Sequence, residues 1–227
     1  MIQILRPTAG FAALLTVLVA PVAPRQAEAP WRPAAGPLMT RWAADVSPDR
    51  ALPEYPRPQM VRTEWRNLNG LWDYAIRPRL EAQPAAFDGR ILVPFPVESA
   101  LSGVMKKVGE TNRLWYRRTF EIPAAWRSQR TLLHLGAVDW EAAVSVNGQE
   151  VGTHRGGYSE MTFDISRALT PAGSQELVVA VWDPTDTGTQ PRGKQVNRPG
   201  SIWYTSVTGI WQTVWVEPVP ERAIDAL

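Results

Sequence analysis

Two aspartates that lie close together in the sequence are the best candidates in this chain for a pair of carboxylates that act at one site. Asp183 and Asp186 belong to the segment Val181-Trp-Asp-Pro-Thr-Asp186, at the end of an apolar run. Carboxylates that share a loop with backbone carbonyls can bind calcium. Aspartate in a turn ahead of proline also accepts hydrogen bonds from nearby backbone N–H groups. We expect a strand-end turn here and keep a calcium site as the alternative.

The chain has two histidines and no cysteine, which narrows the possible metal chemistry. His134 lies within the apolar segment Leu132–Leu135, and His154 lies in the glycine-rich segment Gly152–Tyr158. Zinc sites use cysteine and histidine ligands at short spacings, and no His-x-x-His spacing occurs in this sequence. We therefore expect two structural histidines, no zinc site and no cofactor.

A long loop between Thr185 and Tyr204 carries residue types that recognise sugars. Amide, guanidinium and ammonium groups can hydrogen-bond to hydroxyls, and aromatic rings can cover the C–H face of a pyranose. A loop of this length without regular structure is often functional. The predicted sugar-binding residues are Arg192, Lys194, Gln195, Trp203 and Tyr204. The alternative is a solvated loop that docks on a neighbouring domain.

Short apolar segments separated by Gly- and Pro-rich turns must position this loop. Strands are expected at Ile91–Val93, Leu114–Ile122, Thr131–Leu135, Ala142–Val146, Met161–Ile165 and Leu177–Trp182. Asn147-Gly148 predicts a tight hairpin, because both residues tolerate the positive φ that such turns require. Many short strands joined in this way predict an all-β fold, specifically an antiparallel β-sandwich.

The closing segment Gly209–Glu217 has the alternation of a single strand. A period of two puts Ile210, Gln212, Val214 and Val216 on one face and Trp211, Thr213, Trp215 and Glu217 on the other. The chain has eleven tryptophans against five phenylalanines. Because most of these tryptophans lie in alternating segments, we expect about two-thirds of them in the core.

The composition indicates one ordinary domain with no affinity for nucleic acid. The 227 residues carry a formal net charge of +2, and the basic residues are scattered rather than gathered in a stripe. Regular structure is expected to form one sandwich domain over residues 59–220. Residues 30–58, rich in Pro, Ala and Arg, are interpreted as a linker or extended arm. Residues 221–227 are interpreted as the start of a linker to a next domain.

The N-terminal residues predict export. Arg6 precedes the apolar run Gly10–Ala20, which has the length of a signal-peptide core and is too short for a membrane span. Ala27-Glu28-Ala29 has the small-x-small form of a cleavage site. We expect a signal peptide over residues 1–29, a periplasmic or extracellular location, and no membrane association after cleavage. An uncleaved anchor is the alternative.

Several of these segments together resemble the N-terminal sugar-binding domain of glycoside hydrolase family 2, the family of β-galactosidases and β-glucuronidases. The similarity runs from Leu68 to Pro218 and rests on segments that occur in order, namely Trp115–Phe120, Gly152–Tyr158, Ile202–Thr205 and Gly209–Glu217. It implies a jelly roll of the galactose-binding-domain-like type and carbohydrate as a partner. It also implies immunoglobulin-like and barrel domains that follow in the same enzyme. Because the family's catalytic glutamates belong to the barrel, this chain alone is expected to be inactive and to hold no catalytic residue.

The comparison with the family also separates this chain from its β-galactosidase and β-glucuronidase branches. There, an aspartate six residues before the closing Gly-Ile reaches the substrate sugar, and the matching position here is Trp203. Specificity for galactose or glucuronic acid is therefore not transferred. The implied function is that of a sugar-binding module in an exported enzyme that hydrolyses O-glycosidic bonds with retention. The alternatives are a freestanding carbohydrate-binding module and a non-catalytic structural or interaction domain.

Overall fold

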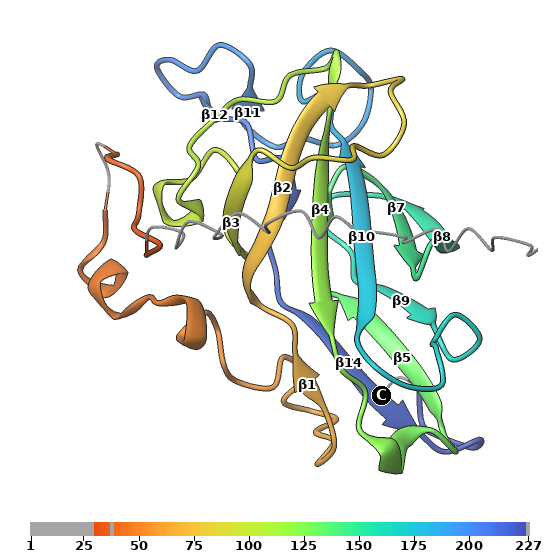
Figure 1. The fold of residues 1–227 in the computed structure, drawn as a ribbon. Coiled ribbons are helices and arrows are strands. Elements are labelled where there is room, and N and C mark those ends of the chain that lie inside the picture. The colour runs from red at the N-terminus through yellow and green to blue at the C-terminus, as the bar shows by residue number, and fades with distance from the viewer. Residues whose placement is uncertain (1–29, 37–38, 226–227) are drawn as a thin grey trace, which may run out of the picture. The chain divides into compact units, whose positions relative to one another are not determined.

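Two antiparallel β-sheets pack face to face and enclose the hydrophobic core (Figure 1). The computed structural model describes residues 30–36 and 39–225. The predicted signal peptide over residues 1–29 lies outside the described residues, and the architecture below is that of the unit Trp31–Leu227. Among the described residues, no helix has the length and apolar character needed to cross a membrane.

The larger sheet has six strands in the order β3-β2-β4-β10-β7-β8. Their bounds are β2 Gly70–Pro78, β3 Gly89–Val93, β4 Asn112–Phe120, β7 Glu141–Val146, β8 Gln149–Arg155 and β10 Gln175–Trp182. Asn147 and Gly148 form the two-residue turn between β7 and β8 with φ values of 50° and 77°. The tight hairpin expected from this dipeptide is confirmed.

The smaller sheet has four strands in the order β1-β14-β5-β9. Their bounds are β1 Arg66–Asn67, β5 Arg130–Leu135, β9 Met161–Asp164 and β14 Val214–Val219. Two short pairs complete the strands: β6 Val138–Asp139 with β13 Gly209–Ile210, and β11 Gln195–Val196 with β12 Tyr204–Thr205. The only helical elements in the described part are single 3-10 turns, namely η1 Arg41–Asp45, η2 Pro48–Arg50, η3 Ala100–Ser102 and η4 Ala124–Trp126.

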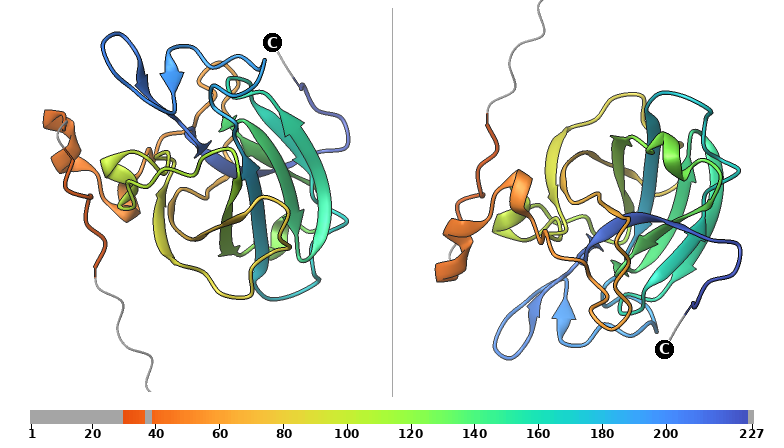
Figure 2. Two further views of the ribbon diagram at one scale, coloured as in Figure 1. Left: turned by 90° about the horizontal axis from the view of Figure 1, so that it is seen from above. Right: turned by 90° about the horizontal axis from the view of Figure 1, so that it is seen from below.

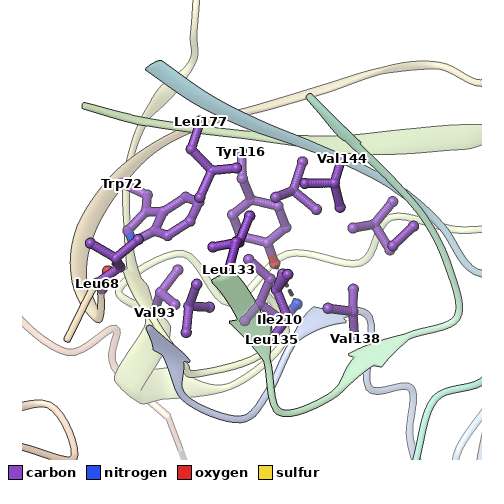
Figure 3. Packing of buried hydrophobic residues seen from close by; sticks show 14 of the residues in the cluster. Leu68, Trp72, Val93, Tyr116, Leu133, Leu135, Val138, Val144, Leu177 and Ile210 are labelled. Carbon is purple, nitrogen blue, oxygen red and sulfur yellow. Dashed lines mark hydrogen bonds between the residues drawn. The ribbon is translucent and has the colours of Figure 1, made fainter. Parts of the chain in front are cut away.

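The core forms where the inward faces of the two sheets meet. Figure 3 shows Trp72, Tyr116 and Leu177 of the larger sheet opposite Leu133 of the smaller sheet and Ile210 of β13. Buried polar groups in this core have partners: the Trp72 indole donates to the Leu68 carbonyl at 2.8 Å, and the Tyr116 hydroxyl accepts from the Ile210 N–H at 3.2 Å. The antiparallel sandwich expected from the sequence is confirmed, and most of the expected strands appear within a few residues of their predicted bounds.

The closing segment departs from its predicted form in one respect. It is two strands rather than one, because β13 pairs with β6 while β14 pairs with β5 and β1. The chain changes partners between Ile210 and Val214, which breaks the alternation. Gln212, expected on the same face as Ile210, is exposed to solvent.

The expected share of tryptophans in the core is also wrong. Only four of the eleven are buried, namely Trp72, Trp115, Trp126 and Trp215. Several others lie at strand ends or in turns, where their rings contact arginines or other rings on the surface. Trp182, at the end of β10, is an example, with the Arg79 guanidinium 3.4 Å from its ring centroid.

Candidate functional site

The predicted loop begins with a tightly bonded turn at Asp183, directly after β10. This carboxylate accepts hydrogen bonds from the Thr185 N–H at 2.7 Å and from the hydroxyls of Thr185 and Thr208, each at 3.0 Å. The expected strand-end turn is confirmed. Its bond to Thr208 also ties the beginning of the loop to the residue that precedes β13.

The middle of the loop folds back on itself as a projecting ribbon (Figure 2). The Asp186 carboxylate accepts from the backbone N–H of Asn197 at 3.2 Å and from the side-chain amide of the same residue. Strands β11 and β12 pair in parallel, and this register puts Gln195 opposite Tyr204. Two predicted sugar-binding residues, far apart in the loop sequence, thereby become neighbours.

Gln195 and Tyr204 line a cavity of about 430 Å³ at the base of this ribbon. The loop between β3 and η3 forms the opposite wall, so the cavity is assembled from distant parts of the chain. Its lining residues are Gly36, Pro96, Glu98, Ser99, Ala100, Met105, Gln195, Tyr204, Thr205, Ser206 and Val207. The volume and the mixture of apolar and polar groups are those of a small-molecule site.

Glu98 is a carboxylate in this cavity that sequence reasoning missed. One oxygen accepts from the Ser206 hydroxyl at 3.1 Å and the other from the Thr208 N–H at 2.9 Å. These donors lie more than a hundred residues away in the sequence, so nothing local indicates the contact. Burial raises the pKa of Glu98 to about 7, although the hydrogen bonds from Thr208 and Ser206 oppose the shift.

Two further carboxyl groups contribute to the electrostatics around Glu98. Burial, followed by the charges of Asp183 and Glu98, raises the pKa of Asp139 to about 7. Burial also raises the pKa of Asp183, despite its hydrogen bonds from Thr185 and Thr208. The charges of Asp183 and Glu98 therefore both act on Asp139.

The other predicted sugar-binding residues are not brought to this cavity. Arg192, Lys194 and Trp203 do not line it, although they belong to the same loop. Trp203 is 42% exposed, and its backbone N–H donates to the Gly200 carbonyl at 3.1 Å. Of the five predicted residues, only Gln195 and Tyr204 therefore reach the cavity.

Asp183 and Asp186, the possible calcium ligands, have the partners described above. The described residues contain no group of three or more His, Cys, Asp or Glu side chains placed to hold a metal ion. His134 lies in β5 and is 1% exposed, with Nδ1 2.8 Å from the Thr162 hydroxyl. His154 lies near the end of β8 rather than in the following loop, and its Nε2 is 3.0 Å from the Ser159 hydroxyl.

A second cavity, of about 440 Å³, lies between Trp140, Trp182 and the first part of the loop. The two indoles meet edge to face with ring centroids 6.4 Å apart. The Arg79 guanidinium already covers a face of Trp182. Both indoles are partly buried, whereas Tyr204 beside the first cavity is 59% exposed.

The fold and the first cavity together define a β-sandwich domain with a cavity formed by its loops. Residues 90–216 match the family described as glycosyl hydrolases family 2, sugar binding domain, and the chain belongs to this family. The resemblance proposed from the sequence is confirmed. The jelly-roll class is confirmed with it, because the similar solved structures are family 2 β-glucuronidases.

Relatives with known names are β-glucuronidases and β-galactosidases. The chain is 26% identical to a β-glucuronidase of Paenibacillus borealis over 146 residues, which covers 62% of this chain and 24% of the relative. It is 30% identical to the β-glucuronidase of Felis catus over 197 residues, which covers 77% of this chain and 28% of the relative. A solved β-glucuronidase from Ruminococcus gnavus superposes with a TM-score of 0.56 at 23% identity, over 71% of this chain and 30% of that chain. The chain thus matches less than a third of the length of each of these relatives.

Proposed function

We propose that this chain is the N-terminal sugar-binding module of an exported family 2 glycoside hydrolase, and that it binds a pyranose in the cavity beside Tyr204. The observation that carries the proposal is the set of groups that meet there. An exposed aromatic ring, an amide and a fixed carboxylate line one cavity, from Tyr204, Gln195 and Glu98 respectively. The ring offers a face for sugar C–H groups, while the amide and carboxylate bond to hydroxyls.

In the whole enzyme, the proposed reaction is hydrolysis of an O-glycosidic bond with retention. Such a reaction uses two carboxyl groups about 5–5.5 Å apart on opposite sides of the scissile bond. Glu98 is the one carboxylate among the described residues that line the cavity. We therefore assign the catalytic pair to a barrel domain outside this sequence. The module braces that domain and completes the rim of its sugar site.

The exposed apolar residues of the projecting ribbon support a second role for the loop. Ile202 is 60% exposed and Trp203 is 42% exposed, and neither lines the cavity. Exposed apolar groups that lie together commonly mark a protein contact. In this proposal they contact the next domains of the same enzyme, while Gln195 and Tyr204 face the sugar.

Saturation-transfer NMR tests the binding. Methyl β-D-galactopyranoside and methyl β-D-glucopyranoside are titrated against the purified chain. Tyr204→Ala is expected to weaken binding about fivefold or more, because stacking on an aromatic ring contributes on the order of 1 kcal/mol or more. Trp203→Ala is the matched control: it removes the neighbouring aromatic residue of the same loop and should leave binding unchanged. Loss of binding in Trp203→Ala but not in Tyr204→Ala would contradict the proposed site.

Aryl glycosides test the assignment of the chemistry. The purified chain is expected to release no aryl alcohol above the uncatalysed rate. Turnover that disappears in Glu98→Gln or Asp183→Ala would place the catalytic carboxylates in this chain and refute the assignment.

N-terminal sequencing tests export. The mature protein should begin close to residue 30, and a start at Met1 would contradict cleavage.

A further inference from the structure

The charge of the cavity beside Tyr204 has one sign. Among the described residues that line it, Glu98 alone carries a formal charge. The loop cations Arg192 and Lys194 are absent from the lining. In the described part of the chain, the hydrogen-bond donors to the Glu98 carboxylate are the Ser206 hydroxyl and the Thr208 N–H, and both are neutral.

We propose that this cavity selects uncharged pyranosides and rejects uronic acids, and that Glu98 determines this selection. The inference rests on the proposed function, because it assumes that the cavity binds a sugar. The observation behind it is the single carboxylate, that of Glu98, among the described residues that line the cavity. Glu98 contacts the sugar in this proposal and therefore acts as a specificity-determining residue.

The physical reason is the difference between a hydroxyl and a carboxylate as a neighbour of Glu98. A hydroxyl donates a charge-assisted hydrogen bond to a carboxylate that is already held in place by two protein donors. A uronate has no proton to donate at that position and adds a second negative charge at close range. Repulsion between like charges grows as water is excluded from the site.

The test compares ligands that differ at one carbon. Binding of methyl β-D-glucopyranoside and of methyl β-D-glucuronide to the full chain is measured by saturation-transfer NMR at pH 8.5. The neutral glycoside is expected to bind at least tenfold more tightly, a ratio that corresponds to about 1.4 kcal/mol. Glu98→Gln keeps the size of the side chain and removes its charge, so the ratio should fall towards one. Glu81→Gln removes one negative charge from an exposed position outside the cavity and should leave the ratio unchanged.

A salt titration of the unaltered chain repeats the test without any variant. Raising NaCl from 50 to 500 mM screens charge repulsion, so uronide binding should strengthen while binding of the neutral glycoside stays constant. Equal affinity for the two glycosides, or a ratio that Glu98→Gln does not change, would overturn this inference and leave the sugar-binding function in place. Absence of binding for both glycosides would overturn the proposed function and this inference with it.

Discussion

The imidazole of His134 lies parallel to the indole of Trp215, with ring centroids 4.6 Å apart and an interplanar angle of 9°. The two residues are direct partners in the β5–β14 register, on the face of the smaller sheet that points away from the core. Each is only 1% exposed, because the segment before β1 covers this face. The Arg57 guanidinium lies 5.5 Å from the Trp215 ring centroid. The sandwich therefore has a third, polar layer beyond its second sheet.

Glu217 is the centre of this layer, and its removal should destabilise the protein strongly. It is completely buried, accepts a hydrogen bond from the Tyr55 hydroxyl at 2.8 Å, and pairs with Arg57 and with Arg62. Glu217→Ala leaves partly buried cations unpaired, so we expect a loss of about 3–5 kcal/mol in unfolding free energy. Urea denaturation followed by tryptophan fluorescence measures it.

Asp164→Ala is the control for that measurement. Asp164 also pairs with an arginine, Arg130, at 2.9 Å, but its side chain is 41% exposed. The loss should stay below about 1 kcal/mol, because solvent screens the pair. Equal losses in the two variants would show that the covering segment adds no stability through Glu217.

The same carboxylate predicts loss of stability in acid. Burial acts to raise the pKa of Glu217, but the His134 ring nitrogen 3.2 Å away, the hydrogen bond from Tyr55 and the charge of Arg57 outweigh it, so the pKa lies below its ordinary value of 4.5. A group with a lowered folded-state pKa stabilises the fold above its unfolded pKa, and this contribution is lost as pH falls through the folded value. Unfolding free energy should therefore drop below pH 4.5 more steeply in the unaltered chain than in Glu217→Gln. Parallel pH profiles of the two proteins would contradict this.

Asp139 predicts the opposite dependence. No hydrogen-bond donor among the described residues contacts its carboxylate, and its folded-state pKa is raised to about 7 from 3.8. Unfolding free energy therefore falls as pH rises from about 4 to 7, and the full cost is present above pH 7. Asp139→Asn should stabilise the chain by about 1–3 kcal/mol at pH 8.5 and have little effect at pH 4. Thermal unfolding at the two pH values measures the difference, and a gain of equal size at both would refute the electrostatic cause.

Two glycines allow the destabilising effect of side-chain crowding to be measured separately from that of backbone strain. Gly209 has φ of +93°, and a Cβ there would collide with the Tyr116 hydroxyl. Gly148 has φ of +77°, and a Cβ there would meet nothing within 4 Å. Gly148→Ala should cost about 1–2 kcal/mol from the left-handed backbone alone. Gly209→Ala should cost roughly 3 kcal/mol or more, because overpacking adds to that strain. Equal destabilisation in urea would show that Tyr116 moves aside freely.

The strands that form the core could be predicted because the residues that specify each strand are close together in the sequence. Alternating large apolar residues in β4 and β10 and the Asn147-Gly148 turn specify extended segments and a hairpin whatever surrounds them. The same alternation could not show that the closing segment changes sheets. That change depends on which neighbour each half pairs with, and pairing partners are far away in the sequence.

The burial of the outer face of the smaller sheet could not be predicted from the alternation of residues either. Trp215 and Glu217 alternate with core residues, so a period of two places them on the solvent side of a two-layer sandwich. A third layer buries them, and its residues come from the Pro-rich segment that precedes β1 and has no regular period. The candidate site depends on the same kind of long-range packing. The sequence identified Gln195 and Tyr204 by residue type, whereas Glu98 lines the same cavity from a distant part of the sequence.

Residue order alone was sufficient to specify an all-β sandwich and its family, because side-chain alternation and turn chemistry act between near neighbours. Long-range packing was needed to choose which loop residues share a cavity, to give that cavity a single negative charge, and to cover the polar face of the smaller sheet. The burial of a residue and the electrostatic potential around it depend on groups that come together only in the folded chain. Neither quantity can therefore be predicted from neighbouring residues in the sequence.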